Sequence, residues 1–178
     1  DEPLYIQLPL QSFEDDVFPP AGWQNVANSD GWERADGYSS GFWSIPDLPD
    51  GAGEWFALAE DDSDLGDDCC TYLITPELDL REASDYSLDF IYWWSGAFGS
   101  NGGFVEYSTD GGATWEMLVE LNAVFDWTQQ SIDLSDMSGP DGLSSVWFGF
   151  HYDDAGFWAD GFAVDMVYVG NGPVDVMG

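Results

Sequence analysis

The chain has 178 residues, of which 44% are hydrophobic and 17% aromatic, and it carries 35 Asp and Glu against only 2 Lys and Arg. The net charge of -33 excludes nucleic acid and anionic lipid surfaces as partners, because proteins bind phosphate groups with Lys and Arg. The aromatic content excludes a disordered acidic tail, and the absence of an apolar run of about 18 residues excludes membrane insertion by a helix.

The first predicted element is a strand over residues 1–11. Apolar side chains alternate with others at Leu4, Ile6, Leu8 and Leu10. Because Pro3 and Pro9 have no backbone N–H, this strand belongs at a sheet edge. Two arrangements stay open: the strand completes the sheet of its own subunit, or it is donated to the next copy, which would build a filament.

Further along the chain, four period-2 patterns separated by Gly-rich turns predict strands. They cover residues 86–94, 115–121, 146–152 and 162–168. This pattern indicates an all-β fold, a jelly-roll β-sandwich of two antiparallel sheets. We assign residues 12–170 to this domain, residues 1–11 to the extra N-terminal strand and residues 171–178 to a C-terminal tail.

One turn between these strands has a specific signature. Residues 108–115 read Ser-Thr-Asp-Gly-Gly-Ala-Thr-Trp, the pattern of an Asp-box hairpin. In this pattern the carboxylate of Asp110 accepts hydrogen bonds from turn amides and Trp115 packs beneath the turn. The motif therefore predicts a structural hairpin rather than a catalytic site.

Several segments, taken together and in order, resemble the cleaved-adhesin or choice-of-anchor J family of secreted bacterial proteins, which has a MAM-like jelly roll. The segments are residues 13–15, 19–23, 72–80, 107–115, 127–134 and 162–169. The resemblance spans residues 12–170 and implies a jelly roll, calcium binding and no intrinsic catalysis. It also implies an extracellular protein, secreted or attached to the cell surface. The start at Asp1 rather than Met adds the expectation that a secretion leader has been removed.

The resemblance also implies calcium ligands. The family pattern places them at Glu14, Asp15, Asp30 and Asp165. Asp165 is notable without the family, because it interrupts an apolar strand where a bare buried carboxylate is costly, so a metal or a hydrogen-bond network should neutralise it. The acidic run at residues 60–64 supplies a second candidate pair, Asp61 and Asp62, with a solvated charge run as an equally weighted alternative.

The two cysteines are adjacent, at Cys69 and Cys70. Neighbouring strand residues point to opposite faces, so a bridge between them requires a turn. We slightly favour a vicinal disulfide. Bridges to partner chains and a pair of reduced thiols are the alternatives.

Ten tryptophans are unusual for one domain. Four of them are predicted to lie in loops or on the outer strand face, where they would stack on sugar rings or bury a subunit contact: Trp32, Trp43, Trp93 and Trp158. Most acid–base and nucleophilic mechanisms of catalysis lack a partner residue, since His151 is the only histidine and lysine is absent. A pair of carboxylates for glycoside hydrolysis stays a minor alternative.

These observations lead to one functional hypothesis and one alternative. The first is an extracellular, non-enzymatic, calcium-stabilised structural or adhesive protein that associates with copies of itself through the N-terminal strand. The alternative is a monomeric, calcium-dependent adhesin module that binds glycans or other cell-surface components.

Overall fold

The computed structural model describes residues 3–28, 30–60, 62, 70–96 and 102–172, which form eleven strands and two 3-10 helices. The strands are β1 (Ile6–Gln11), β2 (Gln24–Val26), β3 (Trp32–Ala35), β4 (Phe56–Ala59), β5 (Thr71–Ile74), β6 (Ser87–Trp94), β7 (Gly102–Ser108), β8 (Glu116–Glu120), β9 (Thr128–Asp133), β10 (Trp147–Asp153) and β11 (Phe162–Gly170). The helices are η1 (Leu80–Glu82) and η2 (Ser135–Met137). Each helix has three residues, so no described helix has the length or hydropathy of a membrane span.

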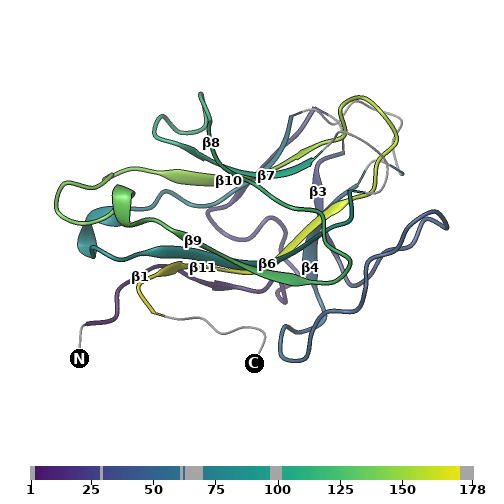
Figure 1. Ribbon diagram of the computed structural model, residues 1–178, viewed down its shortest axis with the longest axis horizontal. Helices are drawn as coiled ribbons and strands as arrows, with labels where there is room; N and C mark the ends of the chain where they lie inside the picture. The colour runs from purple at the N-terminus through teal and green to yellow at the C-terminus, as the bar shows by residue number, and fades with distance from the viewer. Residues whose placement is uncertain (1–2, 29, 61, 63–69, 97–101, 173–178) are drawn as a thin grey trace.

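The strands form two antiparallel sheets that lie face to face (Figure 1). One sheet has the order β3-β4-β11-β6-β9, with β1 paired to β11, and the other has the order β2-β5-β10-β7-β8. Strands that are distant in sequence are neighbours in both sheets, as β11 between β4 and β6 illustrates. The predicted all-β jelly-roll sandwich is confirmed.

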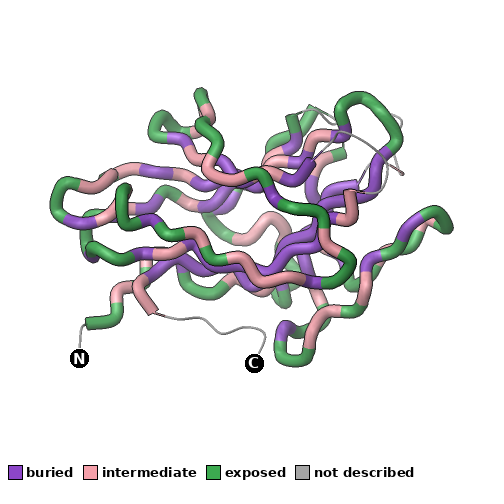
Figure 2. The backbone as a smooth tube through the Cα atoms, in the orientation of Figure 1, coloured by how far each residue is buried: buried purple, intermediate pink, exposed green. Residues whose placement is uncertain are grey.

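The main core fills the space between the sheets (Figure 2). Alternate side chains of β6 and β10 point into it, and the rings of Phe90 and Phe150 meet edge to face with centroids 5.1 Å apart. Both rings are fully buried, and burying a side chain of this size contributes about 1.5–3 kcal/mol. The period-2 pattern of these strands therefore identified the inward face.

A second core lies on the opposite face of the first sheet. The long connection between β3 and β4 supplies Trp43, Ile45 and Ala52, which pack against Ile91 and Trp93 of β6. Strand β6 is therefore buried on both faces from Leu88 onward, although its alternating pattern predicted only one buried face. Trp93, which we expected on an accessible face, is only 3% exposed.

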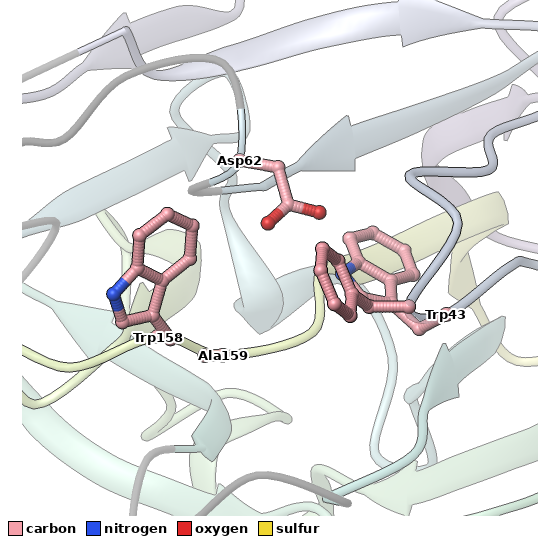
Figure 3. A pocket seen from close by; sticks show the side chains of 5 residues that line it. Trp43, Asp62, Trp158 and Ala159 are labelled. Atoms are coloured by element: carbon pink, nitrogen blue, oxygen red, sulfur yellow. The ribbon is translucent and has the colours of Figure 1, made fainter.

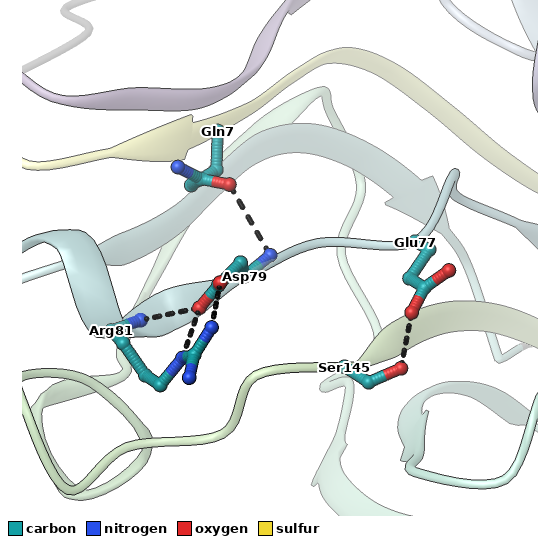
Figure 4. A network of polar contacts seen from close by, with 5 residues as sticks. All are labelled: Gln7, Glu77, Asp79, Arg81 and Ser145. Atoms are coloured by element: carbon teal, nitrogen blue, oxygen red, sulfur yellow. Dashed lines mark hydrogen bonds and ion pairs between the residues drawn. The ribbon is translucent and has the colours of Figure 1, made fainter.

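Strand β1 pairs with the second half of β11 in the same chain. Tyr5 and Asn171 extend this pairing by two hydrogen bonds: the backbone N of Asn171 donates to Tyr5 O (3.1 Å), and Tyr5 N donates to the side-chain Oδ1 of Asn171 (2.7 Å). Gln7 adds a contact outside the sheet, because its Oε1 accepts from the N–H of Asp79 (3.2 Å; Figure 4). Of the two open arrangements, the structure has the one in which residues 6–11 complete their own sheet.

The continuous apolar face predicted for β1 was wrong. Two register shifts against β11, between Ile6 and Leu8 and between Leu8 and Gln11, interrupt the two-residue period. Only Leu8 enters the core. The other three predicted side chains are exposed: Leu4 63%, Ile6 48% and Leu10 46%.

The Asp-box hairpin between β7 and β8 has the predicted structure. The carboxylate of Asp110 accepts from Thr114 N (2.9 Å), Thr114 Oγ1 (2.7 Å) and Ser108 Oγ (2.8 Å). The ring of Trp115 stacks on Tyr72 of β5, in the same sheet, with centroids 4.9 Å apart. The motif serves the fold, as its sequence indicated.

Candidate functional site

A pocket of about 280 Å³ opens beside the second core, and we call it the aromatic pocket (Figure 3). Its lining comes from three connections between strands: β3–β4, β4–β5 and β10–β11. The lining residues are Phe42, Trp43, Asp62, Trp158 and Ala159. In Figure 3 the Asp62 carboxylate lies between the rings of Trp158 and Trp43.

Two of the rings in the aromatic pocket are unusually accessible. Phe42 is 81% exposed and Trp158 is 63% exposed, whereas large apolar side chains outside binding surfaces are more often covered. Neither ring lies in a strand. These two side chains therefore offer most of the aromatic surface that a ligand would meet.

Trp43 forms the fixed base of the aromatic pocket. Its ring stacks with Tyr38 at a centroid distance of 4.5 Å and with Trp93 at 5.7 Å. Its indole N–H is buried and has no hydrogen-bond partner among the residues that the structure describes. A ligand would meet only the small exposed part of this ring, held rigid by its two neighbours.

The carboxylate of the aromatic pocket is positioned by a small polar network. The Tyr38 hydroxyl donates to Glu60 Oε2 (2.9 Å) and to Asp62 Oδ2 (3.3 Å), and Asp62 N donates to Glu60 Oε2 (2.6 Å). Burial and the adjacent Glu60 carboxylate raise the pKa of Tyr38 well above its usual range, so Tyr38 remains a donor at any physiological pH. Asp62 thus presents an acceptor to the pocket from a defined position.

The sequence-predicted binding residues divide into two groups. Trp43 and Trp158, which are far apart in sequence, both line the aromatic pocket. Trp93 supports Trp43 from behind, and Trp32 belongs to the main core, where it meets Phe162 edge to face at 5.1 Å. The expectation of accessible rings was wrong for Trp32 and Trp93, because strands β3 and β6 are covered at these positions.

Sequence reasoning missed Phe42 and assigned Asp62 to a metal rather than to the aromatic pocket. Phe42 follows Ser39-Ser40-Gly41 in a segment without strand alternation, where a large apolar side chain has no core to enter. A large apolar side chain in a segment without a strand pattern is the sequence signal that could have identified Phe42.

Asp30 lies in a separate acidic pocket of about 220 Å³, lined by Asp30, Gly31, Glu33 and Glu60. Burial, followed by the charges of Glu60 and Asp30, raises the pKa of Glu33. The predicted ligands Asp30 and Asp62 are thus both associated with Glu60. Asp61 lies outside the described residues.

Asp165 is fully buried, at the point where β11 changes partner from β4 to β1. Its Oδ1 accepts from Met166 N (2.7 Å), and Met166 has a φ of 55°, which is uncommon for a side chain of this kind. Oδ2 has no hydrogen-bond partner within the described ranges. Burial, and to a lesser extent the charge of Glu14, raises the pKa of Asp165 to about 8.

The neighbouring Glu14 is exposed but firmly placed. Its Oε1 accepts from the backbone N–H groups of Glu54 (2.8 Å) and Trp55 (3.0 Å). A Cβ at Gly53 would collide with the Glu14 carboxylate, so glycine is needed for this approach. Asp15, the next predicted ligand, is exposed.

The orphaned Oδ2 of Asp165 fits a cation, because an unpaired buried carboxylate oxygen is otherwise costly. The described residues hold no group of three or more His, Cys, Asp and Glu side chains arranged for a metal. Calcium takes 6–8 oxygen ligands, so backbone carbonyls and water would have to complete a shell begun by Asp165 and Glu14.

Two other predicted features have partial outcomes. Cys70 is exposed in the turn before β5, and Cys69 lies outside the described residues, so their pairing stays a prediction. His151, expected at the strand surface, is mostly covered, with a side chain 12% exposed. It stacks on Tyr72 at 4.2 Å, and its Nδ1 lies 3.2 Å from Glu106 Oε1.

No protein-family model and no curated protein sequence matches this chain. Solved structures do. The K1 cleaved adhesin domain of Lys-gingipain from Porphyromonas gingivalis W83 matches with a TM-score of 0.59 and 19% identity, covering 92% of this chain and 98% of that domain. The K3 domain of the same protein matches with a TM-score of 0.61 and 14% identity, with the same coverage.

A xylan-binding module is also similar. The CBM22-1 domain of Paenibacillus barcinonensis Xyn10C matches with a TM-score of 0.55 and 10% identity, covering 98% of this chain and 99% of that domain. At these identities the similarity establishes a fold shared with adhesin and carbohydrate-binding jelly rolls. The chain therefore has an adhesin-like jelly-roll fold.

Proposed function

We propose that the chain is an extracellular, non-enzymatic module of the cleaved-adhesin type that binds glycans or glycan-bearing surfaces through the aromatic pocket. The observation that carries this proposal is the exposure of Phe42 and Trp158 around the fixed Asp62 carboxylate. Planar rings pack on the apolar faces of sugar rings, and a carboxylate accepts hydrogen bonds from sugar hydroxyls. The fold shared with an adhesin domain and with a xylan-binding domain supports this proposal.

The test is binding to a panel of polysaccharides, including xylan, followed by titration of the best ligand with Trp fluorescence or calorimetry. Trp158→Ala should weaken binding about tenfold or more, since it removes an exposed ring without touching the core. Phe125→Ala is the matched control, because Phe125 is 98% exposed and does not line the pocket. Absence of binding across the panel, or equal loss in both variants, would refute the proposal.

We further propose that calcium stabilises the domain at Asp165 and Glu14. Its support is the buried, unpaired Oδ2 of Asp165 next to a second carboxylate. An ion there would supply the positive charge that the two arginines of this chain do not bring to Asp165: Arg34 donates to the carbonyls of Phe13 and Glu14, and Arg81 pairs with Asp79. Calcium is the expected cation because carboxylate and carbonyl oxygens are its usual ligands.

Self-association by strand donation is a second proposal, in which residues 1–11 pair with another copy of the chain. The exposed side chains of Leu4, Ile6 and Leu10 favour a contact between copies, whereas the pairing of β1 with β11 of its own chain disfavours donation.

Deletion of residues 1–11 distinguishes the two arrangements. If β1 belongs to its own sheet, the truncated chain should lose at least about 2 kcal/mol of unfolding free energy, because Leu8 leaves the core. Chemical denaturation of the truncated and full chains measures this loss, with Leu4→Ser as the control that alters an exposed side chain. A truncated chain of unchanged stability that no longer assembles would instead support donation.

A further inference from the structure

This chain has two arginines, and both make their contacts outside the aromatic pocket. Arg34 donates from Nε to Phe13 O (2.7 Å) and from Nη2 to Glu14 O (2.8 Å), and its guanidinium lies 3.5 Å from the centroid of the Trp55 ring. Arg81 is paired with Asp79 at 2.5 Å (Figure 4). Neither arginine lines the aromatic pocket, and lysine is absent from the sequence.

The aromatic and charged side chains that line the aromatic pocket attract positive charge. The faces of Phe42 and Trp158 carry negative electrostatic potential, and a cation within about 6 Å of such a ring is stabilised. The Asp62 carboxylate adds a full negative charge on the same wall (Figure 3). Glu60, which is only 6% exposed and accepts from Asp62 N, lies directly behind it.

We infer that the aromatic pocket binds the ammonium group of an amino sugar, so that the preferred ligand is a glycan with free amino groups. This inference rests on the proposed glycan-binding function and names its ligand class. The ammonium group would lie against the exposed rings and donate to Asp62, while the sugar ring packs on Trp158 or Phe42. A volume of about 280 Å³ is close to the lower end for small-molecule sites and suits one sugar unit of a longer chain.

Acidic and neutral sugars fit the aromatic pocket less well. A uronic acid or a sialic acid would bring a carboxylate next to Asp62 on a chain whose net charge is -33, with no guanidinium at the pocket to receive it. A neutral sugar would offer Asp62 only a hydroxyl donor. Only the ammonium adds the attraction between opposite charges to the hydrogen bond, because a hydroxyl carries no net charge.

The experiment compares two oligosaccharides that share a backbone and differ in charge with a third, neutral one. Binding of a glucosamine oligomer, its fully N-acetylated counterpart and a neutral xylose oligomer is measured by calorimetry at about 0.15 M salt. A buffer of about pH 6 keeps the amino groups protonated. We expect the glucosamine oligomer to bind about tenfold or more tightly than the other two.

Two carboxylate variants separate the pocket from the general acidity of the chain. Asp62→Asn should reduce the preference for the glucosamine oligomer to near parity, because it removes the charge and keeps the shape. Asp141→Asn makes the same change in net charge at an exposed position outside the pocket, and it should leave the preference intact. Trp158→Ala should weaken binding of every oligomer.

Each result supports or overturns a defined statement. Equal binding of the acetylated and free-amino oligomers, or equal effects of Asp62→Asn and Asp141→Asn, would overturn the amino-sugar inference. If binding in that case still depends on Trp158, the proposed glycan-binding function stands. If no oligomer and no polysaccharide of the wider panel binds, or if Trp158→Ala changes nothing, the proposed function itself fails.

Discussion

Two aspartates of this chain, Asp110 and Asp165, are both prominent in the sequence and have opposite environments in the structure. Asp110 is exposed in a hairpin, and its carboxylate accepts from Thr114 and Ser108, which lowers its pKa to about 2. Asp165 is buried in β11 with a single bond from Met166 N, and burial raises its pKa to about 8. One carboxylate is stabilised as an anion by the fold and the other is penalised.

The difference shows that acid content by itself says little about where a cation is needed. Asp110 obtains its donors locally, from residues within four positions in sequence. Asp165 lies on β11 between the part that pairs with β4 and the part that pairs with β1, and its Oδ2 has no hydrogen-bond partner among the described residues. A cation is therefore expected at Asp165 and not at Asp110, although both residues add equally to the charge of the chain.

The largest expected effect comes from Asp165→Asn. In the presence of EDTA at about pH 7.5, the variant should be more stable than the wild type by about 1–3 kcal/mol, since it removes a penalised carboxyl but leaves a buried amide without an assured acceptor. With calcium at about 100 times its Kd, the wild type should gain about 2.7 kcal/mol and the variant should gain little. Chemical denaturation in both buffers measures the four values.

Asp141→Asn is the control for this comparison, because it changes the net charge equally at an exposed site. The metal hypothesis fails if calcium stabilises Asp165→Asn as much as the wild type. It also fails if EDTA leaves the wild-type melting temperature unchanged.

The second effect is the pH dependence of the metal-free protein. In the unfolded chain the Asp165 carboxyl returns to an ordinary pKa of 3.8, whereas in the folded chain its pKa is about 8. Between these values the folded state holds a proton that the unfolded state has lost, so stability falls as pH rises from about 4 to about 8. The slope from this group is at most about 1.4 kcal/mol per pH unit.

Melting temperatures of the wild type and of Asp165→Asn in EDTA, taken across this range, isolate the contribution of Asp165. The remaining carboxylates act on both proteins alike, so the margin by which Asp165→Asn melts above the wild type should shrink as pH falls and change sign before pH 4. Parallel curves would show that Asp165 titrates normally in the folded protein.

The smallest effect is expected for Asp110→Ala. The depressed pKa of Asp110 means that its contribution to stability is present above about pH 4 and is lost as pH falls toward 2, the reverse of the trend at Asp165. The variant should melt slightly below the wild type at neutral pH and together with it near pH 2. A difference that persists at pH 2 would mean that the hairpin depends on the shape of the side chain rather than on its charge.

The period-2 patterns of the sequence identified β1, β6, β8, β10 and β11, but they gave no range for β7, β9 or the short strands β2 to β5. β6, β10 and β11 have seven to nine residues and alternate clearly, so their inward faces could be assigned in advance. β4 has four buried residues, Phe56–Ala59, with no alternation, because the β3–β4 connection covers its outer face. A strand buried on both faces by a distant segment has no period-2 signal of its own.

The tryptophans show the same limit at the candidate site. Trp43 and Trp158 are 115 positions apart in the chain, as their numbers give, and only the packing of two connections against the first sheet brings them to one pocket. Trp93 was predicted to be accessible on the outer face of a strand, yet the β3–β4 connection buries it. Local pattern cannot distinguish these cases, because the covering segment comes from elsewhere in the sequence.

The sequence by itself determined the fold class, the Asp-box hairpin, the net charge, and the position of Asp165 within an apolar strand. Those features depend on composition and on neighbours within a few residues. Tertiary structure alone decided that β1 pairs with β11 of its own chain, that Leu8 is its one core residue, and that Phe42, Asp62 and Trp158 form one pocket. These depend on strand register and on contacts between distant connections, which have no local signature in the chain.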